Sequence, residues 1–159
     1  MKSILIIVSQ FNEAISAKLL QGARKTLFMN GFSEKDLCTL KVPGAFELPV
    51  TAARAAAQGK WDAIICLGCL IQGETPHFEY ISQAVAQGLT RVSLDYRLPV
   101  VFGVLTTSTW EQAAARASLE DEETNKGRKR TIANKGKEAA EAAIQMIETF
   151  QELDHLVIQ

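Results

Sequence analysis

The stretch that decides the fold is GCLIQGETPHFEY, residues 68–80. The run before it, DAIICL at residues 62–67, is almost wholly apolar and has strand length, which is typical of a parallel strand covered on both faces. After it, apolar side chains recur at helical spacing, at Phe78, Ile81, Val85, Leu89 and Val92. We therefore predict that the stretch is the turn from the carboxyl end of a central strand into a helix, which is where open α/β sheets bind ligands.

The second half of this stretch has the composition of an anion site. Gly73 suits a tight turn, Thr75 suits a helix N-cap and Pro76 suits the first helical position. The N–H groups at such a helix start attract anions, together with the helix dipole. His77 follows in the first turn, and an imidazole beside a bound phosphate is a catalytic arrangement because it titrates near neutral pH. The alternative, a helix cap followed by an exposed histidine, fits the residues equally well.

Outward from this stretch, strand and helix patterns alternate. Further apolar strands are predicted at residues 3–9, 37–42 and 99–105, and helices at about 15–30, 46–58, 109–117 and from 134 onward. This order predicts an α/β protein, a three-layer α/β/α sandwich of flavodoxin-like type around a four-stranded parallel sheet. We expect residues 1–159 to form a single domain, with the charged segment at about 120–131 as a solvated loop.

Composition and charge exclude several classes of protein. A net charge of −1 argues against a nucleic-acid binder, and no apolar run is long enough to span a membrane. The first eight residues lack a cleavage-site pattern, which favours a first strand over a signal peptide. Three cysteines, an odd number, suit reduced thiols, so we expect a cytoplasmic protein. The C-x-x-C at Cys66 and Cys69 lies at the end of a buried strand, which disfavours a redox or metal role. No glycine-rich dinucleotide or nucleotide-triphosphate motif is present.

Candidate ligand contacts follow the predicted strands, and because the carboxyl ends of parallel strands meet at one edge they can line one pocket. They are Phe11 and Asn12 after the first strand, Ala45, Phe46 and Glu47 after the second, Gly73, Glu74, Thr75 and His77 after the third, and Phe102, Thr106 and Thr107 in the fourth. An exposed Phe11 offers a face on which a flat ring can stack. The alternative is that Phe11 is a surface residue that only covers the edge of the core. Glu47 can accept from ligand hydroxyls, but a carboxylate also favours a helix start.

Two cations complete the set of candidates. Arg116 lies among alanines on the helix after the fourth strand, where a guanidinium can reach a phosphate at a neighbouring site. Lys135 stands at a helix start, which the dipole disfavours, and this hints at a ligand or a partner. For both residues a solvated surface cation remains the alternative.

Several blocks of the sequence, in order, resemble the lumazine synthase family of riboflavin biosynthesis. The resemblance runs from Ser3 to about Ile147 and rests on residues 11–12, 42–49, 68–80, 99–107, 111–117 and 134–140. It implies condensation of 5-amino-6-(D-ribitylamino)uracil with 3,4-dihydroxy-2-butanone 4-phosphate, the penultimate step of that pathway. The products are 6,7-dimethyl-8-ribityllumazine, phosphate and water, and no metal or organic cofactor is expected.

The resemblance also implies a role for each site residue. Phe11, beside Asn12, stacks on the pyrimidinedione ring, and His77 transfers protons. The ribityl chain is held by Ala45, Phe46 and Glu47, the ring by the backbone of Leu70 and Ile71, and the phosphate by Gly73, Glu74 and Thr75. The neighbouring subunit of a homopentamer supplies Phe102, Arg116 and Lys135.

The chain departs from the family pattern at four places. Gln72 and Ala115 stand where arginine and an acidic residue are common. The segment between Arg116 and Asn134 is longer than usual, and we align residues 134–136 rather than 125–127, because Glu138-Ala139-Ala140 follows. Few residues precede the first strand, so we expect a pentamer rather than a closed shell. The alternatives are a non-catalytic flavin- or lumazine-binding protein on the same scaffold and a flavodoxin-like electron carrier.

Overall fold

A single parallel sheet forms the middle layer of the molecule. The computed structural model describes residues 2–119 and 134–156. Its four strands pair in the order β2-β1-β3-β4, all parallel. Their bounds are β1 (Ile4–Ser9), β2 (Leu37–Val42), β3 (Ala63–Ile71) and β4 (Val100–Thr107). The predicted four-stranded parallel sheet is therefore confirmed.

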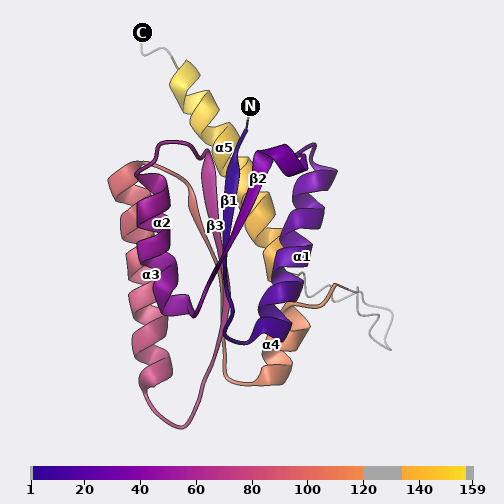
Figure 1. The fold of residues 1–159 in the computed structure, drawn as a ribbon, viewed down its shortest axis with the longest axis vertical. Helices are drawn as coiled ribbons and strands as arrows, with labels where there is room; N and C mark the ends of the chain where they lie inside the picture. The colour runs from indigo at the N-terminus through magenta and orange to yellow at the C-terminus, as the bar shows by residue number, and fades with distance from the viewer. Residues whose placement is uncertain (1, 120–133, 157–159) are drawn as a thin grey trace.

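Helices cover both faces of this sheet (Figure 1). On one face lie α2 (Leu48–Ala56) and α3 (His77–Tyr96). On the other lie α1 (Glu13–Met29), α4 (Trp110–Arg116) and α5 (Lys135–His155). This confirms the predicted three-layer α/β/α sandwich. None of the helices in the described ranges is long and apolar enough to cross a membrane.

The central strands explain the continuous apolar runs of the sequence. Every residue of β1 is buried, and its side chains alternate between two cores. Ile4, Ile6 and Val8 pack toward α1 and α5, while Leu5 and Ile7 pack toward α2 and α3. Because helices cover both faces, neither face of a central strand tolerates polar side chains, and the usual alternation of strand patterns is lost.

The third strand is longer than predicted. Residues 68–71 belong to β3 and not to the turn, since β4 pairs with β3 as far as Ile71↔Thr107. Gly68 is a weak strand former, but a side chain there would clash, because a Cβ would lie 2.7 Å from Ser9 Oγ. The turn that follows is therefore only residues 72–76, and the Gln72 N–H donates to the Thr107 carbonyl at 2.9 Å.

Two predicted helix starts are wrong by one or two residues. Thr75 is not the N-cap of α3, which begins at His77 after Pro76. The second helix does not begin at Phe46, because the short 3₁₀ helix η2 (Ala45–Glu47) precedes α2. A further 3₁₀ helix, η1 (Glu34–Asp36), has no counterpart among the predicted elements. The helix predicted at 109–117 does begin after Thr109, whose Oγ1 accepts from the Gln112 N–H at 3.3 Å.

The structure confirms that a helix, α5, opens at residues 134–136. Asn134 Oδ1 accepts from the N–H groups of Gly136 and Lys137 at 2.9 and 3.1 Å. Its Nδ2 donates to the Ala117 carbonyl at 2.8 Å, so one buried side chain joins the end of α4 to the start of α5. The predicted charged loop at 120–131, the alternative motif at 125–127 and the last residues of the tail lie outside the described residues.

We expect the buried thiols to be inert in the folded protein. Burial raises the pKa of Cys69 to about 11 and raises that of Cys66 further, so thiolate is scarce at neutral pH. A chromogenic disulfide reagent should label the partly exposed Cys38 first, and Cys66 and Cys69 only on unfolding. Equal labelling rates of the three thiols in the native protein would contradict this prediction.

Candidate active site

A cavity of about 310 Å³ lies at the carboxyl ends of β1, β2 and β3, and we call it the His77 cavity. Nine of the predicted site residues line it: Phe11, Asn12, Ala45, Phe46, Leu70, Ile71, Gly73, Thr75 and His77. They come from three separate segments of the chain, which the parallel sheet brings to one edge. Among the described residues that line this cavity, none is a lysine or an arginine.

The turn after β1 presents Phe11 to this cavity. The Phe11 side chain is 69% exposed, and its N–H donates to the Pro43 carbonyl at 3.0 Å, which fixes its backbone. Asn12 adopts the left-handed conformation with φ 59°, which asparagine tolerates better than most residues. Its Nδ2 donates to the Cys69 carbonyl at 3.0 Å. Asn12 therefore ties the turn to β3, and an exposed aromatic face stands at the cavity wall.

The segment after β2 is held by its own carboxylate. Glu47 Oε2 accepts from the Gly44 N–H at 2.9 Å across the 3₁₀ helix η2. Ala45 is buried at the cavity wall, whereas Phe46 is exposed. Glu47 does not line the His77 cavity itself, and neither does Glu74 in the turn after β3.

The start of α3 is open to a ligand. No side chain caps it, and the first intrahelical bonds run from the Glu79 and Tyr80 N–H groups to the Pro76 carbonyl. Residues 72–77 are all exposed, and Gly73, Thr75 and His77 face the cavity. A helix start without a side-chain cap leaves backbone donors for an anion. His77 is the first residue of this helix and lines the same cavity.

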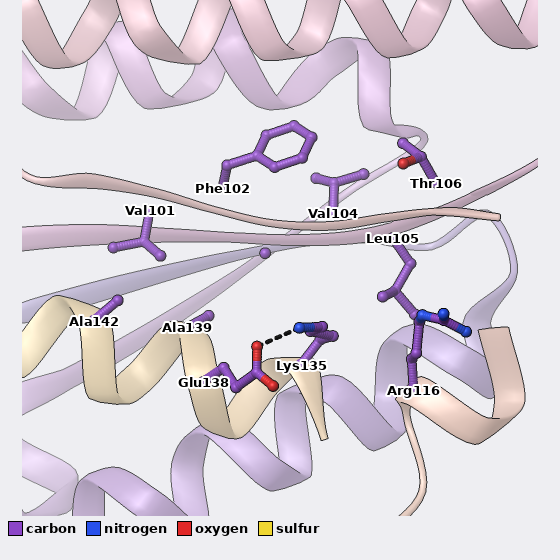
Figure 2. Close-up of a pocket in the computed structure, with 11 residues that line it drawn as sticks. Val101, Phe102, Val104, Leu105, Thr106, Arg116, Lys135, Glu138, Ala139 and Ala142 are labelled. Atoms are coloured by element: carbon purple, nitrogen blue, oxygen red, sulfur yellow. Dashed lines mark hydrogen bonds and ion pairs between the residues drawn. The ribbon is translucent and has the colours of Figure 1, made fainter. Parts of the chain in front are cut away.

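The remaining three predicted residues line a different cavity, of about 410 Å³, which we call the Arg116 cavity (Figure 2). Phe102 comes from β4, Arg116 from the end of α4 and Lys135 from the start of α5. Arg116 Nη1 donates to the Gln112 carbonyl at 3.1 Å, and Lys135 Nζ forms an ion pair with Glu138. This cavity thus holds two cations along the outer edge strand of the sheet.

The two cavities share no lining residue. The expectation that all four strand ends line one pocket is therefore wrong for β4 within the single chain, because Phe102 and Thr106 line the Arg116 cavity and not the His77 cavity. One cavity offers an aromatic face, a helix start and an imidazole, and the other offers positive charge.

Sequence reasoning missed some of the lining residues. Gly44, Phe78 and Ile81 also line the His77 cavity, and Glu138 lines the Arg116 cavity. Phe78 and Ile81 carry the helical period of α3, so their pattern is that of core residues. Glu138 stands three residues after Lys135, which is the spacing of an ion pair on a helix. That spacing could have identified Glu138 from the sequence.

The fold is that of a flavodoxin-like α/β protein, with a cavity at the carboxyl ends of its parallel strands. The sequence matches the profile of the family described as 6,7-dimethyl-8-ribityllumazine synthase over residues 1–151. A protein of that name from Protochlamydia amoebophila is 44% identical over 151 residues, which cover 95% of this chain and 81% of the relative. The chain therefore belongs to the 6,7-dimethyl-8-ribityllumazine synthase family, and the resemblance found in the sequence is confirmed.

Proposed function

We infer that this protein catalyses the reaction after which its family is named. It condenses 5-amino-6-(D-ribitylamino)uracil with 3,4-dihydroxy-2-butanone 4-phosphate, and releases 6,7-dimethyl-8-ribityllumazine, phosphate and water. The observation that carries this inference is the His77 cavity, where an exposed aromatic ring, an uncapped helix start and an imidazole meet in a chain of this family. The reaction joins a flat heterocycle to a phosphate ester, and these groups suit the two halves of that cavity.

In this assignment the pyrimidinedione stacks on Phe11, and the ribityl chain extends along residues 45–47. The second oxygen of the Glu47 carboxylate accepts from ribityl hydroxyls, while Oε2 stays on the Gly44 N–H. The backbone at Leu70 and Ile71 contacts the ring, since these residues end β3 at the cavity wall. The backbone N–H groups of residues 73–75 hold the phosphate, with the α3 dipole behind them.

The reaction needs positioning and proton transfer. The 5-amino group attacks the ketone to form an imine with loss of water, the phosphate leaves, and ring closure loses a second water. His77 is the group we assign to proton transfer, because an imidazole can both accept and donate a proton and this one lines the cavity. Holding two substrates together supplies much of the rate enhancement, since their association no longer costs entropy at the reacting step.

We further propose that a neighbouring copy completes each site. The His77 cavity lacks a lysine or arginine among its described lining residues, yet it must bind a phosphate that becomes a leaving group. Arg116 and Lys135 stand with Phe102 on the open edge strand of the same chain. A head-to-tail contact between copies joins one cavity to the other and closes into a ring, for which we propose a pentamer. We place this assembly in the cytoplasm, as the reduced thiols suggest.

Mixing the two substrates with the purified protein tests the reaction. We expect lumazine absorbance and fluorescence to appear, with one phosphate released per lumazine, and without added metal or nucleotide. His77→Ala should lower kcat by about a hundredfold and change KM less, because proton transfer acts in the transition state. Tight binding of the ribitylaminouracil or of lumazine without turnover would instead support a non-catalytic binding protein.

A further inference from the structure

The end of α4 carries Arg116 and is held by a side chain from another part of the chain. Arg116 is the last residue of this helix, and Ala117 follows it as the C-cap. The carbonyl groups at the end of a helix have no partner within the helix. Asn134 Nδ2 donates to the Ala117 carbonyl at 2.8 Å, in a buried bond that spans 17 positions of the chain. This bond therefore fixes the backbone directly beside the arginine of the Arg116 cavity (Figure 2).

The Asn134 amide is itself fixed by its surroundings. Its Oδ1 accepts from the N–H groups of Gly136 and Lys137, and its Nδ2 also donates to the Lys18 carbonyl at 3.3 Å. Gly22 of α1 leaves space for the amide, because a Cβ at that position would lie 2.3 Å from Asn134 Oδ1. The amide thus lies between α1, α4 and α5, and it cannot rotate without losing several hydrogen bonds.

The short helix α4 needs such a contact to keep its direction. It has seven residues, and a helix of that length is not stable without tertiary contacts. The Arg116 guanidinium donates to the Gln112 carbonyl at 3.1 Å, within the same helix. This bond moves together with α4, so it does not by itself fix where the guanidinium stands. The place of Arg116 in its cavity therefore follows from how the end of α4 is held.

We propose that Asn134 is a positioning residue for Arg116. Its Nδ2 holds the end of α4 through the Ala117 carbonyl, and so fixes the place from which the guanidinium acts. Its Oδ1 has a separate role, because it caps the start of α5. This inference rests on the proposed function, since the exact place of Arg116 matters for the reaction only if Arg116 belongs to an active site.

Two substitutions of Asn134 separate the cap from the contact with α4. Asn134→Ser keeps a good helix cap but loses the Nδ2 donor, whereas Asn134→Ala loses both. We expect each variant to lower kcat/KM for the butanone phosphate by about tenfold, because a small displacement of a catalytic group slows the reacting step. Steady-state kinetics well below the unfolding temperature measures the loss. Wild-type kinetics in Asn134→Ser beside an impaired Asn134→Ala would show that Asn134 only caps α5, and would overturn the proposal.

A double-mutant cycle tests whether Asn134 acts through Arg116. In an Arg116→Ala background, Asn134→Ser should lower kcat/KM by less than about twofold, because the guanidinium that it positions is absent. The same tenfold loss in both backgrounds would show a structural role elsewhere and would overturn the proposal. If Asn134→Ser does not fold, Asn134→Asp takes its place in the cycle, because it keeps the shape of the side chain and its Oδ1 acceptor.

Asn30 provides the matched control at the end of another helix. Its Nδ2 donates to the Thr26 carbonyl at 2.9 Å at the end of α1, and Asn30 lines neither cavity. Asn30→Ser removes the same kind of bond and should leave kcat/KM unchanged. An equal loss in this control would contradict a specific role for Asn134.

The same kinetics distinguish this inference from the function on which it rests. If Arg116→Ala lowers kcat/KM but Asn134→Ser does not, only the role of Asn134 is wrong. If Arg116→Ala has wild-type kinetics, or if the wild type forms no lumazine, the proposed role of Arg116 is wrong, and the positioning role of Asn134 is wrong with it.

Discussion

Co-refolding His77→Ala and Arg116→Ala chains should restore activity that neither variant has alone. Each single change should lower kcat/KM by about a hundredfold or more, because one removes the proton-transfer group and the other a cation beside the leaving phosphate. These residues line different cavities of one chain, and we propose that the two cavities meet between copies. In rings of randomly mixed chains, about a quarter of the head-to-tail interfaces should pair an intact His77 with an intact Arg116.

The control for this experiment uses two defects in the same cavity. Phe11 and His77 both line the His77 cavity, so a mixture of Phe11→Ala and His77→Ala chains has no interface with an intact cavity of this kind. That mixture should regain nothing. Mixed rings detected by mass spectrometry that show no regained activity for the first pair would place Arg116 in the site of its own subunit.

Gly136→Ala should have the largest effect on stability. A Cβ at this position would lie 1.9 Å from the Leu19 carbonyl oxygen and 2.8 Å from its Cα, and these backbone atoms cannot move aside as a side chain can. Helices α1 and α5 would have to separate, which would open the core around Leu19, Ala23 and Ala140. We expect a loss of about 3 kcal/mol or more in the free energy of unfolding, or failure to fold. Urea denaturation at fixed protein concentration measures it.

Gly73→Ala is the matched control for this substitution. A Cβ at Gly73 would have no heavy atom within 4 Å. The free energy of unfolding should therefore change by no more than about 0.5 kcal/mol. A Gly136→Ala protein with the midpoint of the wild type would show that α1 and α5 relax around a methyl group without cost.

Local pattern was sufficient to predict most elements of this fold. The strand at residues 37–42 has its predicted bounds in β2, since an apolar run there ends at Pro43-Gly44. The helices predicted from residues 109 and 134 begin there, and at each start a short polar side chain, that of Thr109 or Asn134, accepts backbone N–H bonds. The errors in element bounds occurred where a contact with a distant part of the chain decides where an element ends. Gly68 belongs to β3 because it pairs with Val104 of β4, and no local period carries that information.

The sequence by itself determined the fold class, the family and the site residues proposed here, because periodicity and motif order are local properties of the chain. The resemblance implied which residues a neighbouring copy supplies, and only the tertiary structure decided where each set lies within one chain. It places Phe11 and His77 in one cavity and Phe102, Arg116 and Lys135 in another, at the edge strand. That division depends on the order of strands in the sheet and on the close contact of α5 with α1 at Gly136. Both are set by packing between segments far apart in the chain, where the fit of side chains decides which elements become neighbours.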